Sequence, residues 1–287
     1  MRVVRTIAEL RQGLAGWRRA GERIGLVPTM GALHAGHMAL VAAARGGCER
    51  VAASIFVNPK QFTPSEDLGS YPRPHAADLE MLRSAGIDLA YLPGVDEIYP
   101  PQFSTVVRVG GLSEGLCGAH RAGHFDGVAT VVSKLLIQSL PDLAYFGEKD
   151  YQQLLIVRRL ARDLDLPVRI EGVPIVREPD GLALSSRNAY LSAAERRIAP
   201  GLCRVLRDVA AALERDPIAV GRETERGRAE LARSGFDVEY LEIRAAEDLA
   251  AVGDVVDRPC RVLAAAYLGR TRLIDNFPIV PATTALN

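Results

Sequence analysis

The chain has 287 residues, of which 48% are hydrophobic and 24% charged, so it holds enough apolar side chains for one large domain or two smaller ones. Lysine plus arginine equals aspartate plus glutamate at 35 each, so no overall positive field attracts a polyanion, and nucleic acid is not expected as the main partner. No apolar run reaches the ~18 residues of a membrane span, and no signal-peptide core follows Met1. We therefore expect a cytoplasmic protein without membrane contact, in which four scattered cysteines stay reduced.

The N-terminal part of the chain predicts two strands, each followed by a helix. Residues 2–20 read as a short strand and a helix, because apolar side chains recur there every three or four residues. The apolar run 24–27 predicts the second strand, which stops at Pro28. After a turn with two glycines and two histidines, helical spacing returns and ends at Gly46.

This turn has the features of a phosphate site. The first turn of a helix has backbone N–H groups without partners and about half a positive charge, which favours phosphate. Gly31 and Gly36 let the backbone approach a ligand, and His34 and His37 can lie on one side and donate hydrogen bonds to phosphoryl oxygens. The alternative is that His37 belongs to the core, but two histidines in one glycine-containing turn favour phosphate binding.

Residues 34–37, HAGH, resemble the HxGH signature of class I nucleotidyltransferases, which place a nucleoside triphosphate against a helix start and attack its α-phosphorus. The longer string 28–37, PTMGALHAGH, resembles the pantoate–β-alanine ligase family. This resemblance implies that His37 is a proton donor and His34 a second catalytic residue. It also implies a run of ATP contacts: Met30, Gly31, Ala32, Leu33, His34, Ala35, Gly36 and His37.

The next strand is predicted over residues 51–57, whose nearly continuous apolar character is typical of a parallel strand buried on both faces. Polar residues 58–62 follow at its carboxyl end, where open α/β sheets bind ligands. The residue types alone leave ordinary loop polarity equally open. The family has a matching NPxQF string, which implies that Gln61 contacts pantoate and β-alanine, and we include Asn58 as a substrate contact.

A helix ending at Gly86, a strand over 89–92 and a short strand over 105–109 are predicted next. Asp78 lies near the start of the helix that ends at Gly86, where the helix dipole favours a negative charge. A role as magnesium ligand is the alternative for Asp78, and the metal ligands are otherwise unassigned. Residues 93–118 receive no function.

Residues 117–127 contain a cysteine and two histidines, but no second Cys/His cluster completes a four-ligand zinc site. The segment resembles the family's RPGHFxGV motif, with Ala122 in place of the usual proline. The resemblance makes Arg121 and His124 candidate contacts on the pantoate or phosphate side.

A buried strand is predicted over 143–146, followed by a helix whose apolar face places Gln153 at the inner edge of the first turn. A polar amide at that position needs a partner. Surface capping could account for the charged residues between strand and helix, but FGEKDYQQL matches the family pattern. The resemblance implies that Lys149 is a phosphate ligand and Gln153 a pantoate ligand. It also implies ATP contacts at Gly147, Glu148, Lys149 and Asp150.

A strand within 168–176 and a turn at 179–181 lead to the string LSSRN, residues 184–188. Two hydroxyls and a guanidinium in succession suit triphosphate oxygens, although a helix cap with a solvated arginine is equally open. LSSRN is similar to the family's MSSRN, the counterpart of the mobile KMSKS loop of related synthetases. The resemblance implies ATP contacts at Val176, Leu184, Ser185, Ser186 and Arg187.

From residue 192 the pattern changes to helices, up to about residue 234, followed by three strand-like runs. Helices followed by strands, without alternation, indicate a separate α+β domain. We therefore predict an α/β protein with a Rossmann-like parallel sheet over 1–175 that binds ATP and pantoate. A smaller α+β domain over 176–287 is expected to act as a lid.

The chain lacks the GxxxxGKS/T and GxGxxG strings, so a P-loop kinase and a nicotinamide dehydrogenase lose their usual sequence support. The resemblance implies an AMP-forming homodimeric ligase that joins pantoate to β-alanine through pantoyl adenylate, with ATP as substrate and Mg2+. A carboxylate with a pKa near ~4 is ionised at neutral pH and attacks without a general base. The site must therefore supply charge and alignment, which we assign to His34, His37 and Lys149. The alternatives are another HxGH adenylyltransferase, a tRNA synthetase and a nucleotide sensor without turnover.

Overall fold

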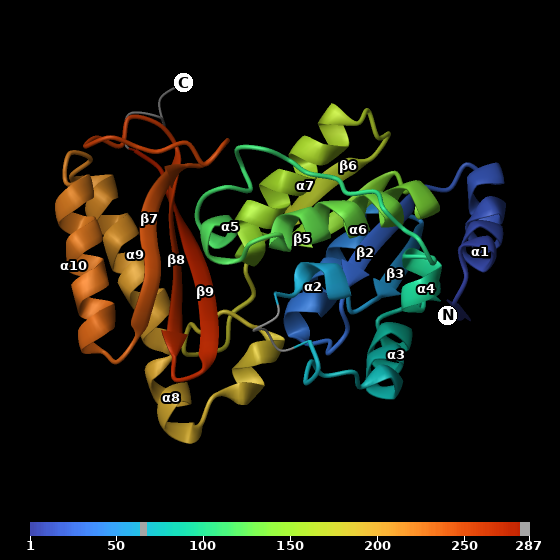
Figure 1. Ribbon diagram of the computed structural model, residues 1–287, viewed down its shortest axis with the longest axis horizontal. Coiled ribbons are helices and arrows are strands. Elements are labelled where there is room, and N and C mark those ends of the chain that lie inside the picture. Colours follow the sequence, from blue (N-terminus) through green and yellow to red (C-terminus); the bar gives the residue numbers. More distant parts are fainter. Residues whose placement is uncertain (64–67, 282–287) are drawn as a thin grey trace. The chain divides into compact units, whose positions relative to one another are not determined.

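The computed structural model describes residues 1–63 and 68–281, within which six parallel strands form one sheet and three antiparallel strands form another (Figure 1). The chain divides into two compact units, described separately below. The first unit comprises Met1–Glu148 and Gln152–Pro174, and the second comprises Lys149–Tyr151 and Ile175–Asn287. The expected division near residue 175 did not assign the short segment Lys149–Tyr151 to the second unit.

The first unit contains the parallel sheet, in the strand order β1-β4-β3-β2-β5-β6, which confirms the α/β, Rossmann-like prediction. The strand order reverses between β2 and β5, and open α/β sheets bind ligands at the carboxyl ends of strands at such a switch point. The residues that follow β2 and β5 are therefore the first candidates for a site. The strands are β1 (Arg2–Val4), β2 (Ile24–Thr29), β3 (Arg50–Ile55), β4 (Leu89–Tyr91), β5 (Leu143–Gly147) and β6 (Arg169–Val173).

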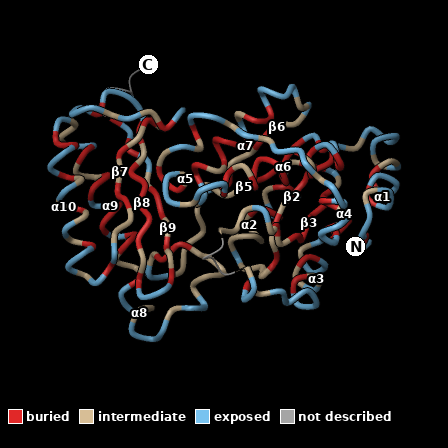
Figure 2. Tube along the Cα trace, in the orientation of Figure 1, coloured by how far each residue is buried: buried red, intermediate tan, exposed pale blue. Residues whose placement is uncertain are grey.

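Helices cover this sheet, and the burial drawn in Figure 2 is continuous along its central strands. One apolar cluster joins α2 and α3 to strands β2 to β5. Helices α1 and α6 pack against each other and against β2. The helical segments are α1 (Ile7–Arg19), α2 (Ala35–Gly47), η1 (Pro59–Gln61), α3 (His75–Ser84), α4 (Val95–Ile98), α5 (Cys117–His120), α6 (His124–Ser139), η2 (Glu148–Asp150) and α7 (Tyr151–Asp163).

The prediction of a strand over residues 105–109 is wrong. The segment is irregular and mostly exposed, and the N–H of Val107 donates to Oγ1 of Thr130 on α6 at 3.0 Å instead of to a neighbouring strand. A β-branched run favours extended backbone, but a strand also needs a ladder partner, and in the described chain this segment has none.

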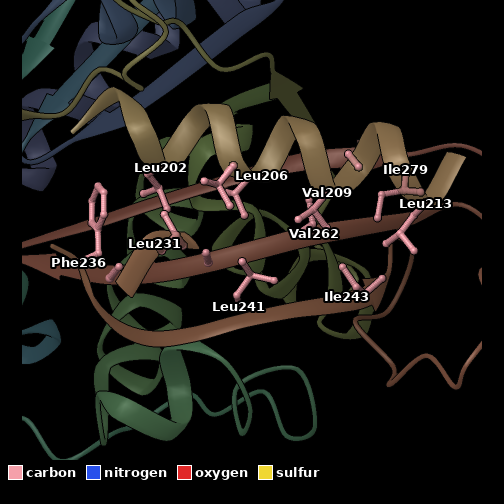
Figure 3. Packing of buried hydrophobic residues seen from close by; sticks show 14 of the residues in the cluster. Leu202, Leu206, Val209, Leu213, Leu231, Phe236, Leu241, Ile243, Val262 and Ile279 are labelled. Carbon is pink, nitrogen blue, oxygen red and sulfur yellow. The ribbon is translucent and has the colours of Figure 1, made fainter. Parts of the chain in front are cut away.

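The second unit places helices on an antiparallel sheet of strand order β7-β8-β9. Side chains of α9 at helical spacing, Leu202, Leu206, Val209 and Leu213, pack against the strands (Figure 3). The helical segment expected from residue 192 to about 216 is split at Pro200, which begins a new helix because proline lacks the N–H that would continue the old one. The elements are η3 (Ser186–Tyr190), α8 (Ala193–Ile198), α9 (Pro200–Arg215), α10 (Val220–Arg233), β7 (Asp237–Ala245), β8 (Cys260–Leu268) and β9 (Thr271–Ile279).

Within the described ranges, every helix is too short or too polar to span a membrane. The same residues contain no group of three or more His, Cys, Asp and Glu side chains that could hold a metal ion.

Candidate active site

The turn between β2 and α2 has a left-handed backbone at two successive residues. Gly31 has φ of +82° and Ala32 has φ of +50°. A Cβ atom on Gly31 would lie 2.9 Å from Oδ2 of Asp78 and 3.1 Å from Cγ2 of Ile55. Only glycine therefore fits at position 31, and Ala32 stays in a conformation that is unfavourable for most residues because its surroundings hold it there.

Asp78 provides that support. It lies in the first turn of α3, as expected, and is only 1% exposed. Its carboxylate accepts hydrogen bonds from the N–H groups of Ala32 at 3.0 Å and Leu33 at 2.8 Å, one at each oxygen. The structure thus gives Asp78 a bracing role in the turn, which is an alternative to the magnesium role considered from the sequence.

His34 and His37 cap the first turn of α2 with their rings. Nδ1 of His34 accepts from the N–H of Gly36 at 3.1 Å, and Nδ1 of His37 accepts from the N–H of His34 at 3.3 Å. A backbone N–H can only donate, so both Nδ1 atoms lack a proton, and each neutral ring carries its proton on Nε2. The ring centroids are 4.2 Å apart. Both residues are only partly buried, which argues against a purely core role for His37.

The ring capping changes the expected chemistry of this helix start. The rings take up the N–H groups of His34 and Gly36, which the sequence reasoning had left for phosphate. Each ring still carries an Nε2–H donor, and the two neighbouring rings lie at the positive end of α2. The arrangement can still bind an anion, through the imidazoles and the helix dipole together.

Asn58, at the end of β3, is 1% exposed, and its side chain forms four hydrogen bonds within the protein. Nδ2 donates to Oε1 of Gln61 at 3.0 Å and to the carbonyl of Gly127 at 3.1 Å. Oδ1 accepts from the hydroxyl of Tyr99 at 2.7 Å and from the N–H of Lys60 at 3.2 Å. Asn58 has no further hydrogen-bonding capacity for a substrate, so we revise its role to the support of Gln61.

Gln61 and Met30 come from separate sequence motifs and meet at the site. Nε2 of Gln61 lies 3.1 Å from Sδ of Met30. β2 and β3 are neighbouring parallel strands, so the residues that follow them lie at the same edge of the sheet. The polar residues after β3 and the string of predicted ATP contacts after β2 are therefore close together.

His124, at the start of α6, is 7% exposed and has the opposite tautomer. Its Nδ1 lies 2.7 Å from the carbonyl oxygen of Gln61, which only accepts, so Nδ1 carries the proton. Its Nε2 accepts from Nη1 of Arg121 at 2.9 Å, because guanidinium only donates. Both ring nitrogens have protein partners, which leaves no support for a zinc site, and His124 fixes the backbone of Gln61.

The buried amide of α7 belongs to Gln152, which the sequence reasoning missed. Gln152 is 5% exposed, and its Oε1 accepts from the N–H of Cys117 at 3.0 Å. Its Nε2 donates to the carbonyls of Leu112 and Gly115, each at 2.8 Å. Gln153 is partly buried, so its role as a pantoate ligand stays a prediction. Helical spacing from Ile156, Val157 and Leu160 favours position 153, but Leu155 and Ile156 also follow position 152 at three and four residues, so a small rotation of the helix buries Gln152 instead.

Lys149 belongs to the second unit, together with Asp150. The carbonyl of Lys149 accepts from Nδ2 of Asn276 on β9 at 3.1 Å. The side chain of Lys149 is 20% exposed, and its Nζ lies 3.9 Å from Oδ2 of Asp150. Gly147 and Glu148, the other predicted ATP contacts of this motif, end β5 and begin η2 in the first unit.

The second unit also brings Val176 and Leu184 together. The N–H of Leu184 donates to the carbonyl of Val176 at 3.0 Å, and the adjacent pair Arg177 and Ala183 forms an antiparallel bridge. Ser185 caps η3, since its Oγ accepts from the N–H of Arg187 at 3.2 Å. The capping alternative thus describes Ser185, while Ser186 and Arg187 are partly buried. Their ATP contacts stay predictions.

The chain is similar over nearly its whole length to proteins of one family. The family model for pantoate–β-alanine ligase matches residues 2–278. A pantothenate synthetase of Paramagnetospirillum magneticum is 53% identical over 97% of this chain and 98% of that protein. The crystal structure of pantothenate synthetase from Thermus thermophilus has a TM-score of 0.92 and 47% identity, covering 98% of this chain and 100% of that one. A pantoate–β-alanine ligase from Francisella tularensis, complexed with β,γ-ATP and β-alanine, has a TM-score of 0.78 and 32% identity, covering 96% and 97%.

Proposed function

The chain belongs to the pantoate–β-alanine ligase family, and from this premise we propose how its residues divide the reaction. The enzyme joins pantoate to β-alanine with consumption of ATP. We place the triphosphate at the start of α2. The observation that supports this assignment most is the pair of Nε2–H groups of His34 and His37, fixed side by side by their own backbone.

In the first step, a carboxylate oxygen of pantoate attacks the α-phosphorus of ATP, and the bond to pyrophosphate breaks. Negative charge grows on the α-phosphate and on the leaving pyrophosphate. His34 and His37 donate hydrogen bonds to these oxygens, and Lys149 adds a full positive charge. Because the His37 ring is neutral, with its proton on Nε2, it acts on the departing group as a hydrogen-bond donor and keeps that proton, which revises the proton-donor role that the resemblance implied. Pantoyl adenylate results.

Gln61 and Gln153 hold pantoate in this scheme. Gln61 is well suited to orient a small polar acid, because Asn58 fixes its side chain and His124 its backbone. A preorganised amide loses little conformational entropy when the substrate binds.

In the second step, the amine nitrogen of β-alanine attacks the activated carbonyl carbon, the bond from that carbon to the phosphate oxygen breaks, and AMP leaves. The attacking nitrogen loses one proton, which the phosphate of the released AMP or solvent takes up. Water would destroy the acyl phosphate, so the site must close during the reaction. We assign this closure to the second unit, a lid that carries Lys149 and the loop residues Leu184 to Arg187.

Magnesium enters with the nucleotide. Mg2+ in ATP sites is usually held by one or two carboxylates and by phosphate oxygens, and it neutralises phosphate charge. In the part of the chain that the structure describes, no cluster of three or more ligands would hold it as a resident ion. Because Mg2+ in ATP sites is bound largely through the phosphates, we treat MgATP as the substrate and route no step through the metal.

Pantoate-dependent exchange of labelled pyrophosphate into ATP tests this function. We expect exchange only when pantoate is present, and release of AMP and pantothenate when β-alanine is added. Exchange without pantoate would indicate a different adenylate, and ATP binding without exchange would indicate a sensor.

We also propose that the enzyme is a homodimer and works in the cytoplasm. A dimer interface could cover apolar side chains that are exposed in the single chain, such as Val106 at 61%, Ile137 at 47% and Leu140 at 50% exposure. Light scattering should give twice the chain mass of 31.0 kDa, whereas a single-chain mass would contradict the dimer. Cell fractionation tests the location.

A further inference from the structure

Two adjacent polar residues on β9, Asp275 and Asn276, are buried to 3% and 2% exposure. Neighbouring residues of a strand point to opposite faces of the sheet. Asp275 is paired with Ala264 of the apolar core, so it lies on the face that packs against the helices, and Asn276 lies on the other face. Burial of polar side chains costs free energy unless they are fully hydrogen-bonded, so their partners indicate their role.

Asp275 binds the segment that leads to the ATP loop. Its two carboxylate oxygens accept from Nη1 and Nη2 of Arg177 at 2.6 and 2.9 Å. Arg177 also donates to the carbonyl of Gly181 at 3.1 Å, which closes the turn of this segment. Burial raises the pKa of Asp275, but the bidentate guanidinium and the N–H of Asn276 at 2.8 Å stabilise its ionised form.

The segment held by Arg177 carries predicted nucleotide contacts at both ends. Val176 precedes Arg177, and Leu184 returns beside Val176 through the 3.0 Å backbone bond. Ser185 to Arg187 follow directly. The ion pair on β9 therefore fixes the base of the loop 184–187.

Asn276 binds the segment that carries Lys149. Its Nδ2 donates to the carbonyl of Lys149 at 3.1 Å, and its Oδ1 accepts from Nη1 of Arg261. The guanidinium of Arg261 lies 3.9 Å from the ring centroid of Tyr151, whose hydroxyl donates to the carbonyl of Ala246 at 2.8 Å. The residues on both sides of Asp150 are thus attached to the antiparallel sheet.

We propose that Asp275 and Asn276 are positioning residues for the adenylation step, which set Lys149 and the loop 184–187 at a fixed spacing on one strand. This inference rests on the proposed function of Lys149 and the loop as triphosphate ligands. A shift of about 1 Å in such a group can slow a reaction ~10²-fold, so a rigid common support has a direct effect on rate.

The ion pair between Arg272 and Glu239 offers a matched control. Arg272 also lies on β9, and the two side chains are 13% and 12% exposed, with Nε of Arg272 3.1 Å from Oε2 of Glu239. This pair joins β9 to β7. Arg272→Met should therefore lower stability without slowing adenylation.

The test combines half-reactions with a double-mutant cycle. We expect Asn276→Ala to slow pantoate-dependent pyrophosphate exchange about tenfold and to raise KM for ATP. Reaction of supplied pantoyl adenylate with β-alanine should stay within twofold of the parent, a split that general loss of stability would not produce. In the Lys149→Ala background, Asn276→Ala should cause less than a twofold further decrease, because it acts through Lys149.

A second double-mutant cycle combines Asp275→Asn with Arg187→Ala and measures the same pyrophosphate exchange. In the Arg187→Ala background, Asp275→Asn should likewise cause less than a twofold further decrease. If Asn276→Ala fails to fold, Asn276→Asp replaces it, since it keeps an acceptor for Arg261 and replaces the amide donor to the Lys149 carbonyl with an acceptor oxygen.

The outcomes distinguish the proposed role of Lys149 from the positioning role of Asp275 and Asn276. Normal exchange in Lys149→Ala would overturn the proposed role of Lys149. Slow exchange in Lys149→Ala with normal exchange in Asn276→Ala and Asp275→Asn would overturn the positioning role alone. Additive effects in both double-mutant cycles would also overturn the positioning role. An equally large decrease of the exchange rate in Arg272→Met would overturn it as well.

Discussion

The tautomers of three histidines follow from backbone partners. His34 and His37 receive N–H groups at Nδ1, whereas His124 donates from Nδ1 to a carbonyl. Two rings thus carry Nε2–H and can donate to phosphate, and the third accepts at Nε2 from Arg121. The same residue type has opposite roles in one unit because the local backbone offers a donor in one case and an acceptor in the other.

Replacement of His37 tests the anion-binding role. His37→Ala removes one Nε2–H donor, and we expect adenylate formation to slow by roughly 10² or more, as for other preorganised donors. Stopped-flow measurement of adenylate formation checks this. His75→Ala, at an exposed position of α3, serves as control and should stay within threefold. A change of less than threefold in His37→Ala would remove His37 from the mechanism.

Asp78→Asn tests whether Asp78 stabilises the turn at residues 32 and 33 or binds magnesium. The asparagine amide would oppose one of the two N–H groups of the turn, so adenylation should slow and the free energy of unfolding should fall by about 1–3 kcal/mol. As a brace, Asp78 has no effect on the Mg2+ concentration for half-maximal rate, which should stay within twofold. A tenfold rise in that concentration would instead indicate a magnesium ligand.

At the scale of elements, the site depends on close contacts between short segments and helices. A Cβ atom on Gly127 of α6 would overlap the carbonyl oxygen of Lys60 in η1. Gln152 of α7 similarly binds the segment 112–117 through three hydrogen bonds. These contacts determine where the residues of η1 and α7 can lie.

Gly127→Ala should therefore be strongly destabilising. The added methyl group meets backbone, which cannot rotate away, so we expect a loss of about 3 kcal/mol or more and weaker pantoate binding through η1. Gly46→Ala is the control, because a Cβ there has nothing within 4 Å and helix propensity should slightly increase stability. Thermal unfolding measures both variants, and equal midpoints would contradict the contact.

The two neighbouring glutamines of α7 should separate stability from binding. Gln152→Ala removes the amide partner of the buried Cys117 N–H and of the carbonyls of Leu112 and Gly115, so we expect a loss of about 2–3 kcal/mol in unfolding free energy. Gln153→Ala should change stability by less than about 1 kcal/mol and raise KM for pantoate. The opposite pattern would reverse the roles of the two residues.

At the scale of the whole molecule, the residues to which we assign roles in the reaction are divided between the two units. The first unit holds the histidines and Gln61, and the second holds Lys149 and the loop 184–187. Each unit has its own apolar core. This division suits a ligase that must bind substrates and then exclude water.

The cysteines provide a test of the native packing. Cys48, Cys117, Cys203 and Cys260 are buried thiols that form no disulfide. Burial raises the pKa of Cys48, Cys203 and Cys260, which lowers the fraction of reactive thiolate. A disulfide reagent at a pH of about 8 should react slowly with the native enzyme and rapidly with all of these thiols after unfolding. Rapid reaction in the native state would contradict this packing.

The sequence by itself determined the fold class, the strand–turn–helix at residues 24–47 and the family, and it showed a change of pattern from residue 192. Periodicity and motif strings are local, so they can be read without knowledge of tertiary contacts. Only the tertiary structure decided that Asn58 supports Gln61, that Asp78 braces the turn, that Gln152 is the buried amide and that residues 105–109 form no strand. These outcomes depend on partners that are distant in the chain, such as Gly127 and Tyr99 for Asn58, the turn at residues 32 and 33 for Asp78, and Cys117 for Gln152. Residue type alone does not identify such partners.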